Sequence, residues 1–234
     1  MDFLESKYLY LGLLIFSISY PLAQSFEWRI KLYKKWKPLF FGTAVMMLVF
    51  IPWDIWFTDY GVWWFRDDYI SGFKIFLLPI EEWLFFFIVP YACIFIYEVL
   101  NYYVKRDIFL KLSRYVFVIL GLILLVLAAL YISSLYTSVT FGLTGIAVLI
   151  LAWLNPKWIG RFLFMYLVSW LPFLLVNGAL TGNFTQAPVV NYNSSEIIGL
   201  RVTTIPIEDS VYNLLMLLIV VSVYEWQKPS LSVS

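Results

Sequence analysis

The sequence predicts an all-α membrane protein, a polytopic bundle of seven transmembrane helices. Three observations predict this class: a hydrophobic content of 62% with only 13% charged residues, seven long apolar stretches, and a one-sided distribution of basic residues. Soluble domains carry roughly 25% charged residues, so most of this surface is expected to face lipid. The net charge of +1 gives no reason to expect a nucleic acid as a partner.

Seven apolar stretches have about the length of a membrane span, which is roughly 17–25 residues for a helix. The expected spans are 8–25, 38–57, 77–100, 114–132, 139–154, 160–180 and 205–226. No cleavage pattern of small residues follows the first stretch. We therefore expect it to be retained as a span and not removed as a signal peptide.

The basic residues predict the orientation of the bundle. With the N-terminus outside, twelve of the 16 Lys and Arg residues fall in cytoplasmic segments, and only Lys7, Arg66, Lys74 and Arg201 fall outside. This distribution agrees with the positive-inside rule. We expect an integral, multi-pass protein with its C-terminus in the cytoplasm, located in the cell inner membrane if the source is bacterial.

One motif occurs twice, 127 residues apart, and each copy leads into an apolar stretch. The first copy comprises Gly72, Lys74, Pro79, Ile80, Glu81 and Glu82, and the second comprises Gly199, Arg201, Pro206, Ile207, Glu208 and Asp209. The repeat predicts a first three-span unit over 1–112, a connecting span over 113–135 and a second three-span unit over 136–234, together one membrane domain. An offset of four spans preserves direction, so the units are parallel repeats.

The paired acids are the candidate functional residues. Each pair follows a proline that suits the first turn of a helix, where the helix dipole favours acids. Such acids can simply face water, but their repetition with the same glycine and basic residue points to a shared polar site. Neighbouring helical residues point about 100° apart, so one acid of each pair can face the interior. Glu81 shares a face with Phe85, and Glu208 with Tyr212.

These residue types fit acid-initiated carbocation chemistry on an apolar substrate. Asp54 and Asn177 end the second span of each unit on the same side as the acids, so the polar groups are expected at a similar depth. Burial disfavours the charged form of a carboxyl, so one acid can stay protonated while another accepts a proton. An aromatic face stabilises a cation by about 0.5–2 kcal/mol. The chain has no His, which excludes a His-based triad and a His-ligated haem.

The first motif, Pro79-Ile80-Glu81-Glu82-Trp83-Leu84-Phe85-Phe86, resembles the Pro-x-Glu-Glu-x-x-Phe-Phe motif of the lycopene cyclase domain family. These integral-membrane proteins occur as paired small subunits in some bacteria and fused in archaea and fungi. The second motif, followed by Tyr212-Asn213, is similar to the C-terminal counterpart in that family, and the segment 53–57 to its N-terminal half. The resemblance covers nearly the whole chain. It is weakest in the sixth span, where Asn177 stands in place of Asp54.

The resemblance implies a lycopene β-cyclase, an isomerase that closes the acyclic ends of lycopene into β-rings during carotenoid biosynthesis, without net redox change. The expected products are γ-carotene and β-carotene. We expect Glu81 and Glu208 to act as acid and base, with Glu82, Asp209 and Asp54 as orienting or alternative groups. The residues expected to contact the substrate are Phe85, Phe86, Tyr212, Asn213, Asn177 and Trp53.

The expected partners are lycopene or a related apolar polyene and membrane lipid, and the sequence allows a homo-oligomer. A Gly-x-Gly-x-x-Gly fingerprint is absent, so we expect no flavin and no other cofactor or metal. Two other classes stay open: another seven-span terpene cyclase, and a non-enzymatic small transporter with parallel repeats. A retinal-binding receptor is disfavoured because the last span lacks a Lys for a Schiff base. A prenyltransferase is disfavoured because no Asp-rich motif for magnesium and diphosphate is present.

Overall fold

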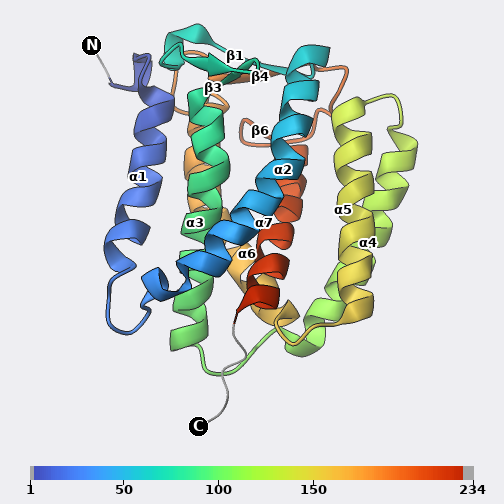
Figure 1. The fold of residues 1–234 in the computed structure, drawn as a ribbon. Coiled ribbons are helices and arrows are strands. Elements are labelled where there is room, and N and C mark those ends of the chain that lie inside the picture. The colour runs from blue at the N-terminus through green and yellow to red at the C-terminus, as the bar shows by residue number, and fades with distance from the viewer. Residues whose placement is uncertain (1–2, 229–234) are drawn as a thin grey trace.

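The computed structural model describes residues 3–228, which form a bundle of seven long α-helices with short strands across one end (Figure 1). The all-α class predicted from the sequence is confirmed. The helices are α1 (Leu9–Gln24), α2 (Trp36–Tyr60), α3 (Ile80–Tyr103), α4 (Leu110–Leu130), α5 (Leu135–Leu154), α6 (Ile159–Leu180) and α7 (Ile207–Gln227). The strands are β1 (Trp63–Phe65), β2 (Lys74–Ile75), β3 (Leu78–Pro79), β4 (Val190–Tyr192), β5 (Arg201–Val202) and β6 (Ile205–Pro206). The 3₁₀ helices are η1 (Phe3–Glu5), η2 (Leu32–Lys35) and η3 (Asp67–Tyr69).

Within residues 3–228, six helices, α2 to α7, are long and apolar enough to cross a membrane. Helix α1 is apolar but has 16 residues. At about 1.5 Å per residue it is about 24 Å long, shorter than the roughly 30 Å hydrocarbon core. All seven predicted spans are therefore found as helices, and the chain is a multi-pass membrane protein whose first helix is short.

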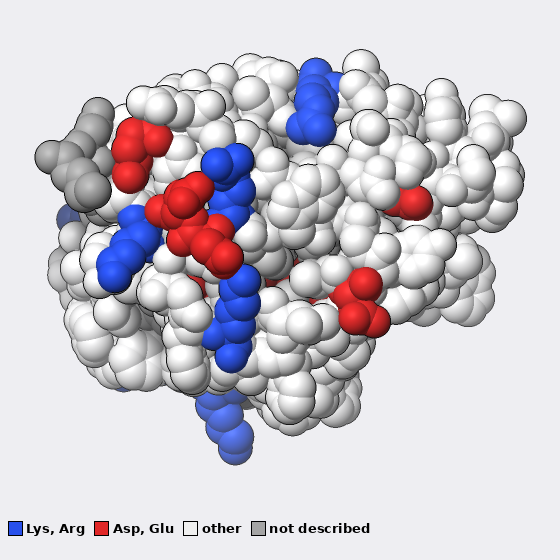
Figure 2. Space-filling view, turned by 90° about the horizontal axis from the view of Figure 1, so that it is seen from above, with Lys and Arg blue, Asp and Glu red and all other residues white. Residues whose placement is uncertain are grey.

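Consecutive helices alternate in direction, so α1 begins and α7 ends at opposite ends of the bundle (Figure 1). The short strands lie at one end, which we call the hairpin end. Figure 2 shows this face, where a few acidic and basic side chains lie among many uncharged ones. Arg66 pairs with Asp68 at 3.0 Å, and Lys74 with Asp67 at 2.8 Å. That the hairpin end faces outward stays a prediction from the charge distribution.

Both copies of the repeated motif fold into the same β-hairpin. β2 pairs with β3 and β5 with β6, and in each hairpin the basic residue of the motif lies opposite its proline. The proline is the last residue before α3 or α7. Gly72 and Gly199 have φ values of +91° and +85°, a left-handed conformation that favours glycine. The motif therefore encodes a turn that delivers two acids to the first turn of a helix.

Replacing Gly199 or Gly72 by Ala is expected to lower the free energy of unfolding by about 1–2 kcal/mol, because a Cβ disfavours the left-handed conformation. No atom lies within 4 Å of the added Cβ at either site, so backbone strain is the dominant cost. Thermal unfolding in detergent would measure it. Gly142→Ala in α5 is the control, since its Cβ would meet Ala128 at an ordinary 3.9 Å. Unchanged stability in both hairpin variants would contradict the expected strain.

The two halves of the chain interlock. Helix α2 packs on α7 and α6 packs on α3, so the second helix of each half contacts the third helix of the other. Strand β1 pairs with β4, placing Trp64 opposite Asn191, and these positions are also 127 apart. The halves are thus related by an approximate two-fold axis near this pair. Helix α4 lies outside this arrangement, against α5 and α6 (Figure 1).

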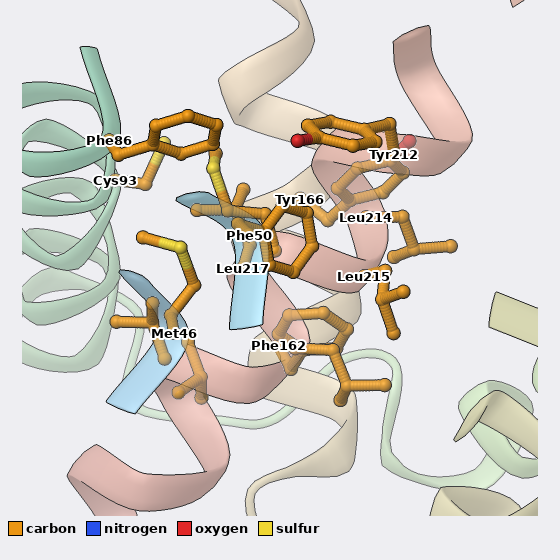
Figure 3. Packing of buried hydrophobic residues seen from close by; sticks show 14 of the residues in the cluster. Met46, Phe50, Phe86, Cys93, Phe162, Tyr166, Tyr212, Leu214, Leu215 and Leu217 are labelled. Atoms are coloured by element: carbon orange, nitrogen blue, oxygen red, sulfur yellow. The ribbon is translucent and has the colours of Figure 1, made fainter. Parts of the chain in front are cut away.

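The apolar core surrounds α7, as Figure 3 shows. Met46 and Phe50 from α2 and Phe86 from α3 pack there with the α7 leucines. Phe50 meets Tyr212 edge to face, with ring centroids 4.7 Å apart, a favourable geometry for aromatic pairs. Tyr212 lies at the upper edge of this core and also reaches the polar site above it. The core therefore forms the floor of that site.

Candidate active site

A small cavity of about 60 Å³ lies at the hairpin end, lined by residues from both halves of the chain. Three carboxyl groups line it: Asp54 from α2, Glu82 from α3 and Asp209 from α7. All three side chains are buried. The aromatic residues that line it include Tyr10, Trp63, Phe85, Tyr136, Tyr192 and Tyr212. Buried acids among aromatic rings in a membrane protein indicate a functional site.

The first half contributes two carboxyls with few hydrogen-bond donors. Glu82 accepts a hydrogen bond from the hydroxyl of Tyr10 at 2.6 Å. Asp54 lines the same cavity, and its Oδ2 has no hydrogen-bond partner among the described residues. Two carboxyls that share a buried site are unfavourable when both are ionised. This half of the site is therefore suited to hold a proton.

The second half surrounds one carboxyl with donors. Asp209 Oδ1 accepts from the hydroxyl of Tyr136 at 2.7 Å, and Oδ2 accepts from the hydroxyl of Tyr192 at 2.7 Å and from the amide of Asn177 at 2.8 Å. Burial, and then the Asp209 charge, raise the pKa of Tyr192 well above its usual value, so this hydroxyl stays a donor at neutral pH. Hydrogen bonds to a carboxylate favour its ionised form. This half is suited to hold a negative charge.

The other acid of each motif faces away from the cavity, toward the loop before its hairpin. Glu81 accepts a hydrogen bond from the backbone N–H of Ser71 at 2.8 Å. Glu208 accepts from the backbone N–H of Ile198 at 2.7 Å and from the hydroxyl of Thr137 at 2.7 Å. Ser71 and Ile198 are also 127 residues apart. Both acids are fully buried and fasten equivalent loops through Oε1, while Oε2 of each acid has no hydrogen-bond partner among the described residues.

The structure divides the other predicted site residues between cavity and core. Phe85, Tyr212, Asn213 and Asn177 are lining residues, and the hydroxyl of Tyr212 and Oδ1 of Asn213 have no hydrogen-bond partner among the described residues. Buried polar atoms without partners call for an explanation, and a ligand is one. Trp53 instead packs on Tyr212 with centroids 5.2 Å apart.

The remaining predicted residue, Phe86, is also a core residue and packs against Phe50 at a centroid distance of 6.1 Å. It therefore supports the cavity from below and does not line it. Of the residues expected to contact substrate, Trp53 and Phe86 are the two that the cavity lining does not include.

Three cavity residues, Tyr10, Tyr136 and Tyr192, are absent from the sequence-based prediction of the site. A signal for two of them exists: Leu9-Tyr10 and Leu135-Tyr136 occupy the same place in the first helix of each half, 126 residues apart. Tyrosines near the end of a membrane span also belong to the ordinary aromatic belt, which concealed their role. Tyr192 lies in a three-residue strand with no comparable signal.

The arrangement can donate a proton from one side of the cavity, surround a cation with aromatic rings, and accept a proton on the other side. No group of three or more His, Cys, Asp or Glu side chains in the described part of the chain is placed to hold a metal ion. Apart from the three carboxyls, Asn177 and Asn213, the side chains that line the cavity are aromatic or aliphatic. It thus combines proton-transfer groups with an apolar surface.

Comparison with known proteins connects this geometry to a family. No curated protein and no solved structure matches the chain. The family model for lycopene cyclase matches residues 7–100 and 133–227, which is most of the chain. The unmatched interval contains α4, the helix outside the two interlocked halves. The chain belongs to the lycopene cyclase family.

Proposed function

We propose that this protein is a lycopene β-cyclase that converts lycopene to γ-carotene and β-carotene in the membrane. The observation that carries the proposal is the cavity at the hairpin end, where Glu82 and Asp54 lie on one side and the hydrogen-bonded Asp209 on the other. The units 1–112 and 136–234 would then be two halves of one active site.

The proposed acid is the Asp54–Glu82 pair, which holds one proton. The proton adds to the terminal double bond of the acyclic end and produces a tertiary cation. The internal alkene attacks this cation, so a carbon–carbon bond closes the ring and the positive charge moves to a ring carbon. Loss of a ring proton then forms the new double bond, and no atom is gained or lost overall.

The proposed base is Asp209. Its hydrogen bonds from Tyr136, Tyr192 and Asn177 hold the carboxylate in place and favour its ionised form before the cation appears. General acid–base groups of this kind contribute about 10²–10⁴-fold to a rate. The proton given by one half of the site is balanced by the proton taken up by the other.

The aromatic wall is proposed to stabilise the cation between these two events. The rings of Trp63, Tyr136 and Tyr212 lie within 6.2 Å of one another, centroid to centroid, and meet at steep angles. A cation close to a ring face gains about 0.5–2 kcal/mol per ring. The same rings exclude water, which would otherwise capture the cation as an alcohol.

Expression of this chain alone in bacteria that accumulate lycopene tests the proposed function. We expect the extracted pigments to contain γ-carotene and β-carotene, identified by chromatography and absorption spectra. Cells that carry Asp209→Asn at the same protein level in the membrane are the control and should retain lycopene. Unchanged pigment with wild-type protein demonstrably in the membrane would contradict the proposal and favour another terpene substrate or a transporter.

A further inference from the structure

A second, larger cavity lies beside the acid cavity. It has a volume of about 340 Å³ and is bounded by α1, α3 and α6, which lie together on one side of the bundle (Figure 1). Its walls are mainly apolar, with Val89, Ala92 and Ile96 on α3 facing Pro172 and Val176 on α6. We call this cavity the α1–α3–α6 groove. Its size is within the range of cavities that bind small molecules, about 300–1,000 Å³.

The groove and the acid cavity adjoin and share part of their walls. Phe85, Phe173, Asn177 and Asn213 line both. Asn177 is also the residue that donates to Asp209. A chain lying in the groove would therefore have its end beside the proton-transfer groups.

The outer rim of the groove lies on the surface of the bundle. Phe16 and Tyr20 of α1 and Leu175 of α6 belong to its wall, and their exposed fractions are 72%, 67% and 54%. These are large apolar side chains on spanning helices, so in a membrane they face lipid. The groove thus leads from the lipid phase sideways toward the acid cavity.

At the equivalent place in the other half of the molecule, aromatic rings pack against one another. By the approximate two-fold relation, α5, α7 and α2 correspond to α1, α3 and α6. There, Phe50 and Trp53 of α2 pack edge to face against Tyr212 of α7, with centroids 4.7 Å and 5.2 Å apart. The corresponding side of the first half has Phe85 and Phe173 at the groove wall instead. The two halves therefore differ in how these corresponding aromatic residues pack.

We propose that the α1–α3–α6 groove binds the unreacted part of an acyclic polyene, which enters sideways from the lipid with the reacting end leading into the acid cavity. This inference rests on the proposed function and assigns the route and the binding surface of its substrate. The small acid cavity has room for little more than an end group. The rest of a long, rigid, apolar chain requires an apolar channel that reaches the lipid, and the groove has this shape and chemistry.

The test narrows the groove at a position that does not line the acid cavity. Ala92 is half-buried on the groove wall of α3, so Ala92→Leu and Ala92→Phe fill the groove progressively. Ala129→Phe, at an exposed position on α4, is the matched control. Binding of lycopene to the protein in nanodiscs is measured by the circular dichroism that a chiral site induces in the polyene absorption. All three substitutions are made with Glu82→Gln, so that bound substrate is not consumed.

We expect lycopene to bind about tenfold or more weakly to the Ala92→Phe protein, less weakly to Ala92→Leu, and as tightly to Ala129→Phe as to the Glu82→Gln parent. Equal affinity in a folded Ala92→Phe or Ala92→Leu protein would overturn the groove assignment. Failure of the proposed function is seen separately, as the absence of cyclised product from the wild type. Binding that is sensitive to Ala92 in a protein that makes no product would support the groove and refute the cyclase.

Discussion

Glu82→Gln and Asp209→Asn are each expected to lower lycopene cyclisation by about 10²–10⁴-fold, the contribution of a general acid or base. A glutamine at position 82 can still accept the hydrogen bond from Tyr10 but has no acidic proton to deliver. An asparagine at position 209 keeps the size of the side chain but cannot accept a proton. The amount of cyclised product per folded membrane protein, followed over time, measures both effects.

The neighbouring acids provide the matched comparison. Glu81→Gln and Glu208→Gln remove a charge at the adjacent position of each pair, where the side chain accepts backbone N–H bonds from Ser71 or Ile198. The glutamine keeps one acceptor oxygen, but its new NH2 group is a buried donor. A buried donor without a partner costs about 1–3 kcal/mol, so these variants should yield less folded protein with nearly normal turnover. Loss of turnover in these two, with activity retained by the variants at 82 and 209, would reverse the assignment.

The sequence identifies the two pairs of acids but not which acid of each pair faces the cavity. The repeated motif identifies two pairs of acids, and helical geometry states that the members of a pair point about 100° apart. Which member faces the cavity depends on how each helix is rotated by its neighbours. Here α2 packs on α7 and α6 on α3, a pairing across the halves that no local pattern encodes. The structure therefore assigns Glu82 and Asp209 to the cavity and leaves Glu81 and Glu208 with the loops.

The helices were largely predictable because each apolar stretch has the length of a span. Two helix starts, those of α4 and α5, lie four residues before the predicted ones, and the second shows the limit of hydropathy. Helix α5 begins at Leu135, four residues before the predicted start, because Tyr136 and Thr137 are too polar to be counted as membrane-embedded. Those are the residues that hydrogen-bond to Asp209 and Glu208. The polarity of these two side chains lowers the hydropathy of the first turn of α5, and the same polarity lets them hydrogen-bond to the acids.

The strands could not be predicted, although they matter for the site. β1 and β4 have three residues each, too short for a pattern of alternation, and they join segments more than a hundred residues apart. Their pairing places Trp63 opposite Tyr192, and both line the cavity. The β1–β4 pair that covers the cavity is therefore a contact between residues far apart in the sequence, and no local sequence pattern predicts it.

The repeat also predicts that matching residues of the two halves make equivalent contacts at the end of the bundle opposite the hairpins. There the contacts of the two halves differ. Tyr97-Glu98 and Tyr224-Glu225 match in sequence, but Glu98 lies at the centre of a cluster of charged side chains and Glu225 at its edge, where it pairs with Lys228 at 3.2 Å. Glu98 pairs with Lys35 and with Lys228 at 3.0 Å, and accepts a hydrogen bond from the hydroxyl of Tyr224 at 2.7 Å. These contacts join η2, α3 and the end of α7. The cluster therefore fastens segments from the two ends of the chain, far from the acid cavity.

Glu98→Ala is expected to lower the free energy of unfolding by about 1–3 kcal/mol, because Lys35 and the hydroxyl of Tyr224 lose a buried hydrogen-bond partner, whereas Lys228 keeps its ion pair with Glu225 at 3.2 Å. The side chain of Glu98 is 4% exposed, whereas Asp68 in the surface pair with Arg66 is 71% exposed. Asp68→Ala is accordingly the control, and no measurable change is expected for it.

Denaturant unfolding in detergent measures the difference, with cyclisation per folded molecule as a second readout. That second value should stay near wild type, since the cluster lies at the end of the bundle opposite the acids. A Glu98→Ala protein as stable as Asp68→Ala would show that Lys35 and Lys228 are solvated well enough without the carboxylate, and the fastening role would be lost. Normal stability with lost turnover would instead mean that this cluster communicates with the hairpin end, which the separation of the two sites argues against.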